Sequence, residues 1–331
     1  MDKKSKLEHK LIEEAHQFPP KVAQNLAEFV ECYAEALHSA GLSFDALGAP
    51  HFHLFFALIR QQLNSPYSFE LYNRKVRHPI DYYQFGLDFI RPLVDEKASK
   101  ALGLEIATEI EQQLKRGENA VLFANHQMEP DPQAISLLLE KTHPHLAEHL
   151  IYVAGERVVT DPLAIPFSLG CDLLCIYSKR YIDHPPEDKA KKQLHNQQTM
   201  EQMRRLLEAG GKAIYVAPAG GRDRKKADGK IPPAPFDPNS IEMFHLMARK
   251  AKTPTHFYPL ALNTHHLLPP PETVQIELGE ARLARRAPIG LALGPKLSME
   301  ENSSLPKEER RKQKAHLIWE KVSVLYQLIE P

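Results

Sequence analysis

The stretch that decides the fold is AVLFANHQMEPDPQAISLLLEK, residues 120–141. Five apolar residues, Ala120 to Ala124, are typical of a buried strand, and the apolar spacing from Pro132 to Lys141 is typical of a helix. A short polar loop joins the two. A buried strand that runs through a short loop into a helix is the repeating unit of α/β folds.

Similar units recur along the chain beyond Arg74. The predicted strands are 120–124, 150–154, 173–177, 213–217, 257–262 and 274–278, and the predicted helices are 105–115, 132–141, 189–208, 240–251 and 306–329. From about residue 5 to residue 75 only helical spacing occurs, broken by prolines and glycines. We therefore expect an α/β fold with a mixed sheet flanked by helices. Residues 1–75 should form a small N-terminal helical bundle, and residues 76–331 the α/β domain.

Composition excludes several classes of protein. The 331 residues carry 42 basic and 42 acidic side chains, so no global positive charge favours nucleic acid. The longest apolar runs are far shorter than the roughly 20 residues of a membrane-spanning helix, so we expect no transmembrane segment. The charged amino end does not resemble a secretory signal, and three cysteines do not form a disulfide framework. These features predict a cytoplasmic protein.

The loop after the first strand carries His126 and Asp131. Loops at the carboxyl ends of strands are where α/β proteins collect catalytic groups. Four intervening residues allow the carboxylate to reach one imidazole nitrogen, which leaves the other nitrogen to act as a base. Because no serine or cysteine adjoins the pair, the base is expected to act on a substrate hydroxyl.

Two other interpretations of this loop stay open at the level of sequence. Asp131 precedes Pro132, so its carboxylate is also suited to cap the helix. His126, Glu129 and Asp131 together offer nitrogen and oxygen ligands for a metal ion, although the six-residue loop is short for that purpose. We expect no metal and no cofactor.

The His-x4-Asp pattern of His126 and Asp131 resembles the signature of glycerolipid acyltransferases. The surrounding residues 125–141 are similar to the soluble, plastid-type glycerol-3-phosphate 1-acyltransferases, and the resemblance extends from about residue 70 to about residue 295. Two further segments, residues 153–180 and 215–224, also resemble that family, and each ends in basic residues.

These basic residues are the candidate phosphate ligands. Arg222 and Arg224 follow a predicted strand and the pair Gly220-Gly221, and arginine suits a phosphate dianion because its guanidinium donates in a bidentate way. By resemblance, Lys179 and Arg180 complete the phosphate pocket. Tyr181 stands where related enzymes often have a histidine.

The resemblance implies transfer of a fatty acyl group from an acyl carrier protein or coenzyme A thioester to the C1 hydroxyl of glycerol 3-phosphate, giving lysophosphatidic acid. His126 and Asp131 would be catalytic, and a soluble compartment like the plastid stroma would be an alternative to the cytoplasm. Partners would be glycerol 3-phosphate and the acyl donor, with transient membrane contact for product release. The alternatives are acylation of another phosphate-bearing acceptor, such as lysophosphatidic acid, and a non-catalytic module that binds an acyl carrier.

Overall fold

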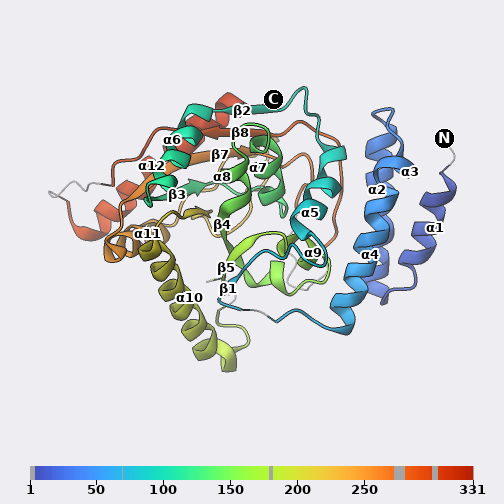
Figure 1. Ribbon diagram of the computed structural model, residues 1–331, viewed down its shortest axis with the longest axis horizontal. Helices are drawn as coiled ribbons and strands as arrows, with labels where there is room; N and C mark the ends of the chain where they lie inside the picture. The colour runs from blue at the N-terminus through green and yellow to red at the C-terminus, as the bar shows by residue number, and fades with distance from the viewer. Residues whose placement is uncertain (1–3, 69, 179–181, 272–279, 300–304, 331) are drawn as a thin grey trace.

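A computed structural model describes residues 4–68, 70–178, 182–271, 280–299 and 305–330 (Figure 1). The strands are β1 (Tyr72–Asn73), β2 (Lys100–Leu102), β3 (Asn119–Ala124), β4 (Leu150–Gly155), β5 (Asp172–Ile176), β6 (Ala213–Val216), β7 (Thr255–Asn263) and β8 (Gly290–Leu293). The helices up to the middle of the chain are α1 (Lys6–Ala15), α2 (Pro20–His38), α3 (Phe44–Leu47), α4 (Ala49–Asn64), α5 (Tyr82–Ile90), α6 (Leu104–Lys115), α7 (Asp131–Leu139) and α8 (Pro144–His149). They are followed by α9 (Ile165–Ser168), α10 (Lys189–Ala209), α11 (Pro238–Ala251) and α12 (Lys307–Ile329), and three short 3-10 turns lie at Arg91–Leu93, Glu156–Val159 and Pro186–Asp188.

The strands form one mixed sheet in the order β1-β5-β4-β6-β3-β7-β8-β2. The pairs β3·β6, β3·β7, β4·β5 and β4·β6 are parallel, and so is β2·β8, whereas β1·β5 and β7·β8 are antiparallel. The predicted α/β class with a mixed sheet is therefore confirmed. Because β3, β6 and β7 run in the same direction, the loops that follow them meet at one edge of the sheet.

Successive side chains of β3 point to opposite faces of the sheet, and helices cover both faces. Val121 and Phe123 point to one face, where they join the core formed with α10, α11 and α12. Leu122 and Ala124 point to the other face, where α6, α7 and α8 pack. All six residues of β3 are buried, as expected for a central strand with helices on both sides.

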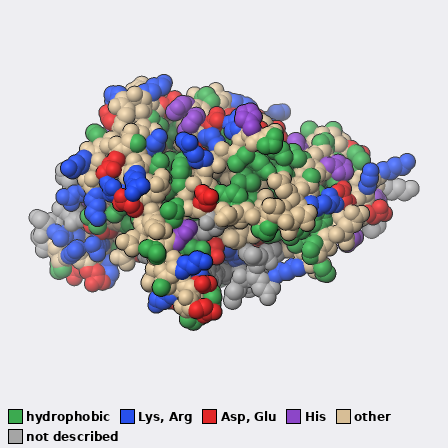
Figure 2. Space-filling model, turned by 60° about the horizontal axis from the view of Figure 1, so that its bottom comes forward, with side chains coloured by type: hydrophobic (Ala, Val, Ile, Leu, Met, Phe, Trp, Pro, Cys, Tyr) green, Lys and Arg blue, Asp and Glu red, His purple; other side chains and the backbone are tan. Residues whose placement is uncertain are grey.

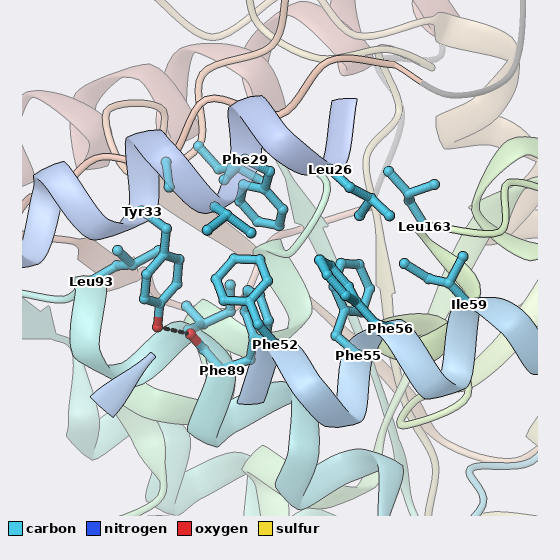
Figure 3. Packing of buried hydrophobic residues seen from close by; sticks show 14 of the residues in the cluster. Leu26, Phe29, Tyr33, Phe52, Phe55, Phe56, Ile59, Phe89, Leu93 and Leu163 are labelled. Atoms are coloured by element: carbon cyan, nitrogen blue, oxygen red, sulfur yellow. Dashed lines mark hydrogen bonds between the residues drawn. The ribbon is translucent and has the colours of Figure 1, made fainter. Parts of the chain in front are cut away.

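The N-terminal helices pack at one end of the molecule (Figure 1) around an aromatic cluster (Figure 3). Phe29, Phe52 and Phe89 form edge-on or tilted ring contacts with centroids 5.0–5.7 Å apart. The hydroxyl of Tyr33 donates to the carbonyl oxygen of Phe89 at 2.7 Å. The helical region predicted before residue 75 is present, and its apolar core continues into α5 and α9. Its division from the rest of the chain at residue 75 stays a prediction.

Five of the six predicted strands correspond to β3, β4, β5, β6 and β7, and the five predicted helices correspond to α6, α7, α10, α11 and α12. The sixth predicted strand, 274–278, lies outside the described residues. Three short strands, β1, β2 and β8, were not predicted. Within the described part of the chain, no helix has the length and apolar character needed to cross a membrane. Basic and acidic side chains are intermixed on the face shown in Figure 2, in keeping with the zero net charge.

Candidate active site

His126 and Asp131 lie where β3 ends and α7 begins, and their side chains are hydrogen-bonded. Nδ1 of His126 is 2.7 Å from Oδ2 of Asp131. The side chain of Asp131 is 1% exposed and that of His126 is 30% exposed, so the carboxylate is buried while the ring reaches solvent. An ionised carboxylate only accepts hydrogen bonds, so Nδ1 carries the proton and Nε2 keeps its lone pair. The predicted pairing is confirmed.

The carboxylate of Asp131 does not cap α7. The helix begins at Asp131 itself, and no side chain caps its first turn. Instead the carboxylate turns back toward its own loop. Oδ2 also accepts the backbone N–H of Gln127 at 2.8 Å, and Oδ1 accepts the hydroxyl of Thr264 at 2.5 Å. The capping interpretation is therefore wrong, because the carboxylate instead accepts hydrogen bonds from two donors of its own loop and from the hydroxyl of Thr264, which follows β7.

The side chains on either side of His126 attach its loop to the end of β7. The amide of Asn125 extends the pairing of β3 with β7, since its Oδ1 accepts the N–H of Leu262 at 2.8 Å and its Nδ2 donates to the carbonyl oxygen of Leu262 at 2.9 Å. Oε1 of Gln127 accepts the backbone N–H groups of Thr264 at 2.7 Å and His265 at 3.1 Å. The position of the imidazole is thus fixed by polar contacts on both sides.

Arg222 and Arg224 lie in the loop after β6, directly beside the His126 loop. The backbone N–H of Asp223, the residue between them, donates to the carbonyl oxygen of His126 at 2.6 Å. The structure therefore brings the two arginines and the histidine to the same sheet edge, as the sequence predicted. Lys179 and Arg180, the other two predicted phosphate ligands, and Tyr181 lie outside the described residues.

Both arginines have partners within the protein. Arg222 forms an ion pair with Glu280 at 2.6 Å, and their side chains are 17% and 8% exposed. Nη1 of Arg224 donates to the carbonyl oxygen of Pro271 at 2.5 Å. Arg157 adds a longer contact to Glu280, at 3.7 Å. A phosphate that reaches Arg222 would share this guanidinium with a carboxylate.

The carboxylate of Glu129 pairs with Arg282. Both of its oxygens accept from Nη2 of Arg282, at 2.9 and 3.0 Å. Burial disfavours the charged form of Arg282, but Glu129 and Asp161 more than offset this and raise its pKa. Glu129 is thereby engaged in a buried ion pair. Among the described residues, no three histidine, cysteine, aspartate or glutamate side chains are grouped to hold a metal ion.

Sequence reasoning did not find Asp223, Thr264, Glu280 or Arg282. Asp223 is wholly buried, and burial raises its pKa to about 6, although hydrogen bonds from Asn125 and Ala234 favour the ionised form. Asp223 is placed between two arginines, a pattern that is more typical of a solvent-exposed charged loop. The available signal was its proximity in sequence to the candidate phosphate ligands.

Comparison with known proteins identifies the family. Residues 105–263 match a family model described as Acyltransferase. A chloroplastic glycerol-3-phosphate acyltransferase of Cucurbita moschata is 38% identical over 96% of this chain and 70% of its own length. That of Arabidopsis thaliana is 38% identical over 87% of this chain and 63% of its own, and that of Pisum sativum is 42% identical over 73% and 53%. The sequence, the sheet edge with its histidine and arginines, and these relatives agree: the chain belongs to the glycerol-3-phosphate acyltransferase family.

Proposed function

We propose that this chain transfers a fatty acyl group from a thioester to the C1 hydroxyl of glycerol 3-phosphate, giving lysophosphatidic acid. The observation that carries the proposal is the contact between the two loops: the carbonyl oxygen of His126 accepts from the residue between Arg222 and Arg224. With His126 as the base and the two arginines as phosphate donors, this contact would hold the two functions side by side. Glycerol 3-phosphate carries both groups on a three-carbon backbone.

In this scheme His126 is the general base and Asp131 orients it. Nε2 removes the proton of the C1 hydroxyl as that oxygen attacks the thioester carbonyl carbon. The tetrahedral intermediate then collapses with cleavage of the carbon–sulfur bond, and the imidazolium returns its proton to the departing thiolate. Asp131 stabilises the imidazolium between the two proton transfers through the 2.7 Å hydrogen bond to Nδ1.

Arg222 and Arg224 would bind the phosphate, together with Lys179 and Arg180. Several fixed cationic donors are needed to bind a phosphate dianion in a partly desolvated site. The donor would be an acyl carrier protein or coenzyme A thioester, and the product would leave through transient contact with a membrane. The cytoplasmic location expected from the sequence stays a prediction. The relatives are named as chloroplastic proteins.

The test is thiol release from acyl carrier protein and coenzyme A thioesters, each with and without glycerol 3-phosphate. We expect release that depends on glycerol 3-phosphate and disappears in His126→Ala, while binding of glycerol 3-phosphate changes little. Equal release with lysophosphatidic acid as acceptor would favour the alternative acceptor. Absence of release with either donor and both acceptors would favour a binding module.

A further inference from the structure

Asp223 contacts the residues on both sides of His126. Its backbone N–H donates to the carbonyl oxygen of His126 at 2.6 Å. Its Oδ2 accepts from Nδ2 of Asn125 at 2.8 Å and from Nε2 of Gln127 at 3.3 Å. The side chain is wholly buried, so water does not compete for these bonds. One residue therefore holds the His126 loop at three consecutive positions.

Asp223 is itself anchored from a third segment. Its Oδ1 accepts the backbone N–H of Ala234 at 2.8 Å. Ala234 belongs to the proline-rich segment 231–238, in which Ile231 and Phe236 are buried. The carboxylate thus joins the His126 loop to an apolar-anchored segment. Because Asp223 also belongs to the arginine loop, a shift of its backbone moves that loop and the His126 loop together.

The side-chain amides of Asn125 and Gln127, which donate to Asp223, cannot turn over without losing hydrogen bonds. Oδ1 of Asn125 is occupied by the N–H of Leu262, and Oε1 of Gln127 by the N–H groups of Thr264 and His265. Both NH2 groups must therefore face residue 223. Only a side chain that accepts at both of its terminal atoms satisfies these two NH2 groups and the N–H of Ala234 together, which an ionised carboxylate does.

We propose that Asp223 is a positioning residue for acyl transfer, which holds the imidazole of His126 and the guanidinium groups of Arg222 and Arg224 in one fixed arrangement. The proposal rests on the proposed function. A substrate that is bound through its phosphate and deprotonated at its C1 hydroxyl requires a constant distance between the guanidinium groups and the imidazole. A displacement of about 1 Å between reacting groups is enough for a loss of about 100-fold in rate.

The competing explanation is that Asp223 is only a satisfied buried polar group. Asp223→Asn separates the two, because it keeps the size of the side chain but turns an NH2 group toward Asn125 and Gln127 or toward the N–H of Ala234. A structural role alone predicts lower stability with normal kinetics of the folded enzyme. A positioning role predicts altered kinetics of the folded enzyme.

The matched control is Asp172→Asn. Asp172 also accepts a backbone N–H, that of Lys75 at 2.8 Å, and its side chain is 16% exposed. It lies at the amino end of β5, away from the sheet edge that carries His126. The same chemical change is therefore made far from the site.

The experiment measures kcat and the KM for glycerol 3-phosphate of the folded full chain and of both variants. For Asp223→Asn we expect kcat/KM to fall by about tenfold or more, with kcat lower and KM higher, since the base and the phosphate donors both shift. Asp172→Asn should stay within about twofold of the unsubstituted chain. A fall of less than tenfold in folded Asp223→Asn would overturn the proposal.

If Asp223→Asn does not fold, the exchange variant Asn125→Asp/Asp223→Asn takes its place. It keeps one carboxylate in contact with one amide, but it leaves the NH2 group of Gln127 without an acceptor at residue 223 and the carbonyl oxygen of Leu262 without its donor at residue 125. The same tenfold threshold applies to it. The ring resonances of His126 in nitrogen-15 spectra give a readout that needs no turnover: they should move in the Asp223 variant and stay fixed in Asp172→Asn. If the unsubstituted chain releases no thiol, the proposed function is wrong. If the His126 resonances do not move in the Asp223 variant, the positioning role is wrong, whatever the outcome of the thiol assay.

Discussion

Replacement of Asp131 by asparagine should remove the negative charge of this side chain while keeping its hydrogen bonds. Oδ2 of Asp131 accepts from Nδ1 of His126 and from the N–H of Gln127, and neither donor can become an acceptor without changing the tautomer or breaking the backbone contact. The hydroxyl of Thr264 at Oδ1 can rotate and accept instead. The amide oxygen of the introduced asparagine should therefore take the place of Oδ2, and the ring should keep its reactive tautomer.

What Asp131→Asn then loses is the attraction between carboxylate and imidazolium. With the charge centres about 4 Å apart and an effective dielectric constant of about 20, this attraction is about 4 kcal/mol. At about 1.4 kcal/mol for each factor of ten, kcat should fall by about 1,000-fold.

The assay is glycerol-3-phosphate-dependent thiol release at saturating substrate, with Asp172→Asn as the control. The KM for glycerol 3-phosphate should change little, because the three donors to the Asp131 carboxylate, on His126, Gln127 and Thr264, lie outside the arginine loop. A loss of less than about tenfold in kcat would contradict this role of Asp131, since a carboxylate that stabilises the imidazolium through about 4 kcal/mol cannot contribute so little.

Three further predictions concern the arginines, the buried carboxylate and the aromatic cluster. Arg222→Lys should raise the KM for glycerol 3-phosphate by about tenfold with a smaller change in kcat, because the bidentate contact is lost but the charge remains; steady-state kinetics check this, and an unchanged KM contradicts it. Burial raises the pKa of Asp223 to about 6, so the folded protein binds a proton on this carboxyl group more tightly than the unfolded chain does. The stability that this proton contributes is therefore complete below about pH 4 and is lost as the pH rises through about 6. Asparagine does not titrate, so the free energy of unfolding of Asp223→Asn relative to the unsubstituted chain should increase by up to about 3 kcal/mol between pH 4 and pH 7. Urea unfolding at several pH values measures this difference, and a difference that does not vary with pH argues against the prediction. Phe52→Ala should lower the free energy of unfolding by about 3–5 kcal/mol, because the ring is fully buried among Phe29, Tyr33 and Phe89; a loss below about 1 kcal/mol would show that the cluster repacks.

The sequence predicted the central strands because they are buried on both faces. Residues 120–124 form an uninterrupted apolar run, which is the pattern of a parallel strand covered by helices. The three strands that were not predicted are shorter than β3, and two of them, β1 and β2, lie at the edges of the sheet. β1 has only two residues, β2 carries an exposed lysine, and β8 begins with a glycine. Their pairing depends on neighbours that lie far away in the sequence.

The same distinction applies to the active site. His126 and Asp131 were predictable because the two partners lie in one short loop. The contacts of Thr264 with Asp131 and of Glu280 with Arg222 join residues that are 133 and 58 positions apart, and neither short sequence segment specifies such a pair. The sequence alone left a helix cap open as a second role of the Asp131 carboxylate, because the choice between the two roles depends on which donors are buried nearby.

An experimental structure with glycerol 3-phosphate bound would show whether His126 and the two arginines act on the same molecule. We predict phosphate oxygens within hydrogen-bonding distance of Arg222 or Arg224, and the C1 oxygen within about 3.2 Å of Nε2 of His126. A phosphate bound elsewhere, or a C1 hydroxyl turned away from the imidazole while the phosphate contacts these arginines, would contradict it.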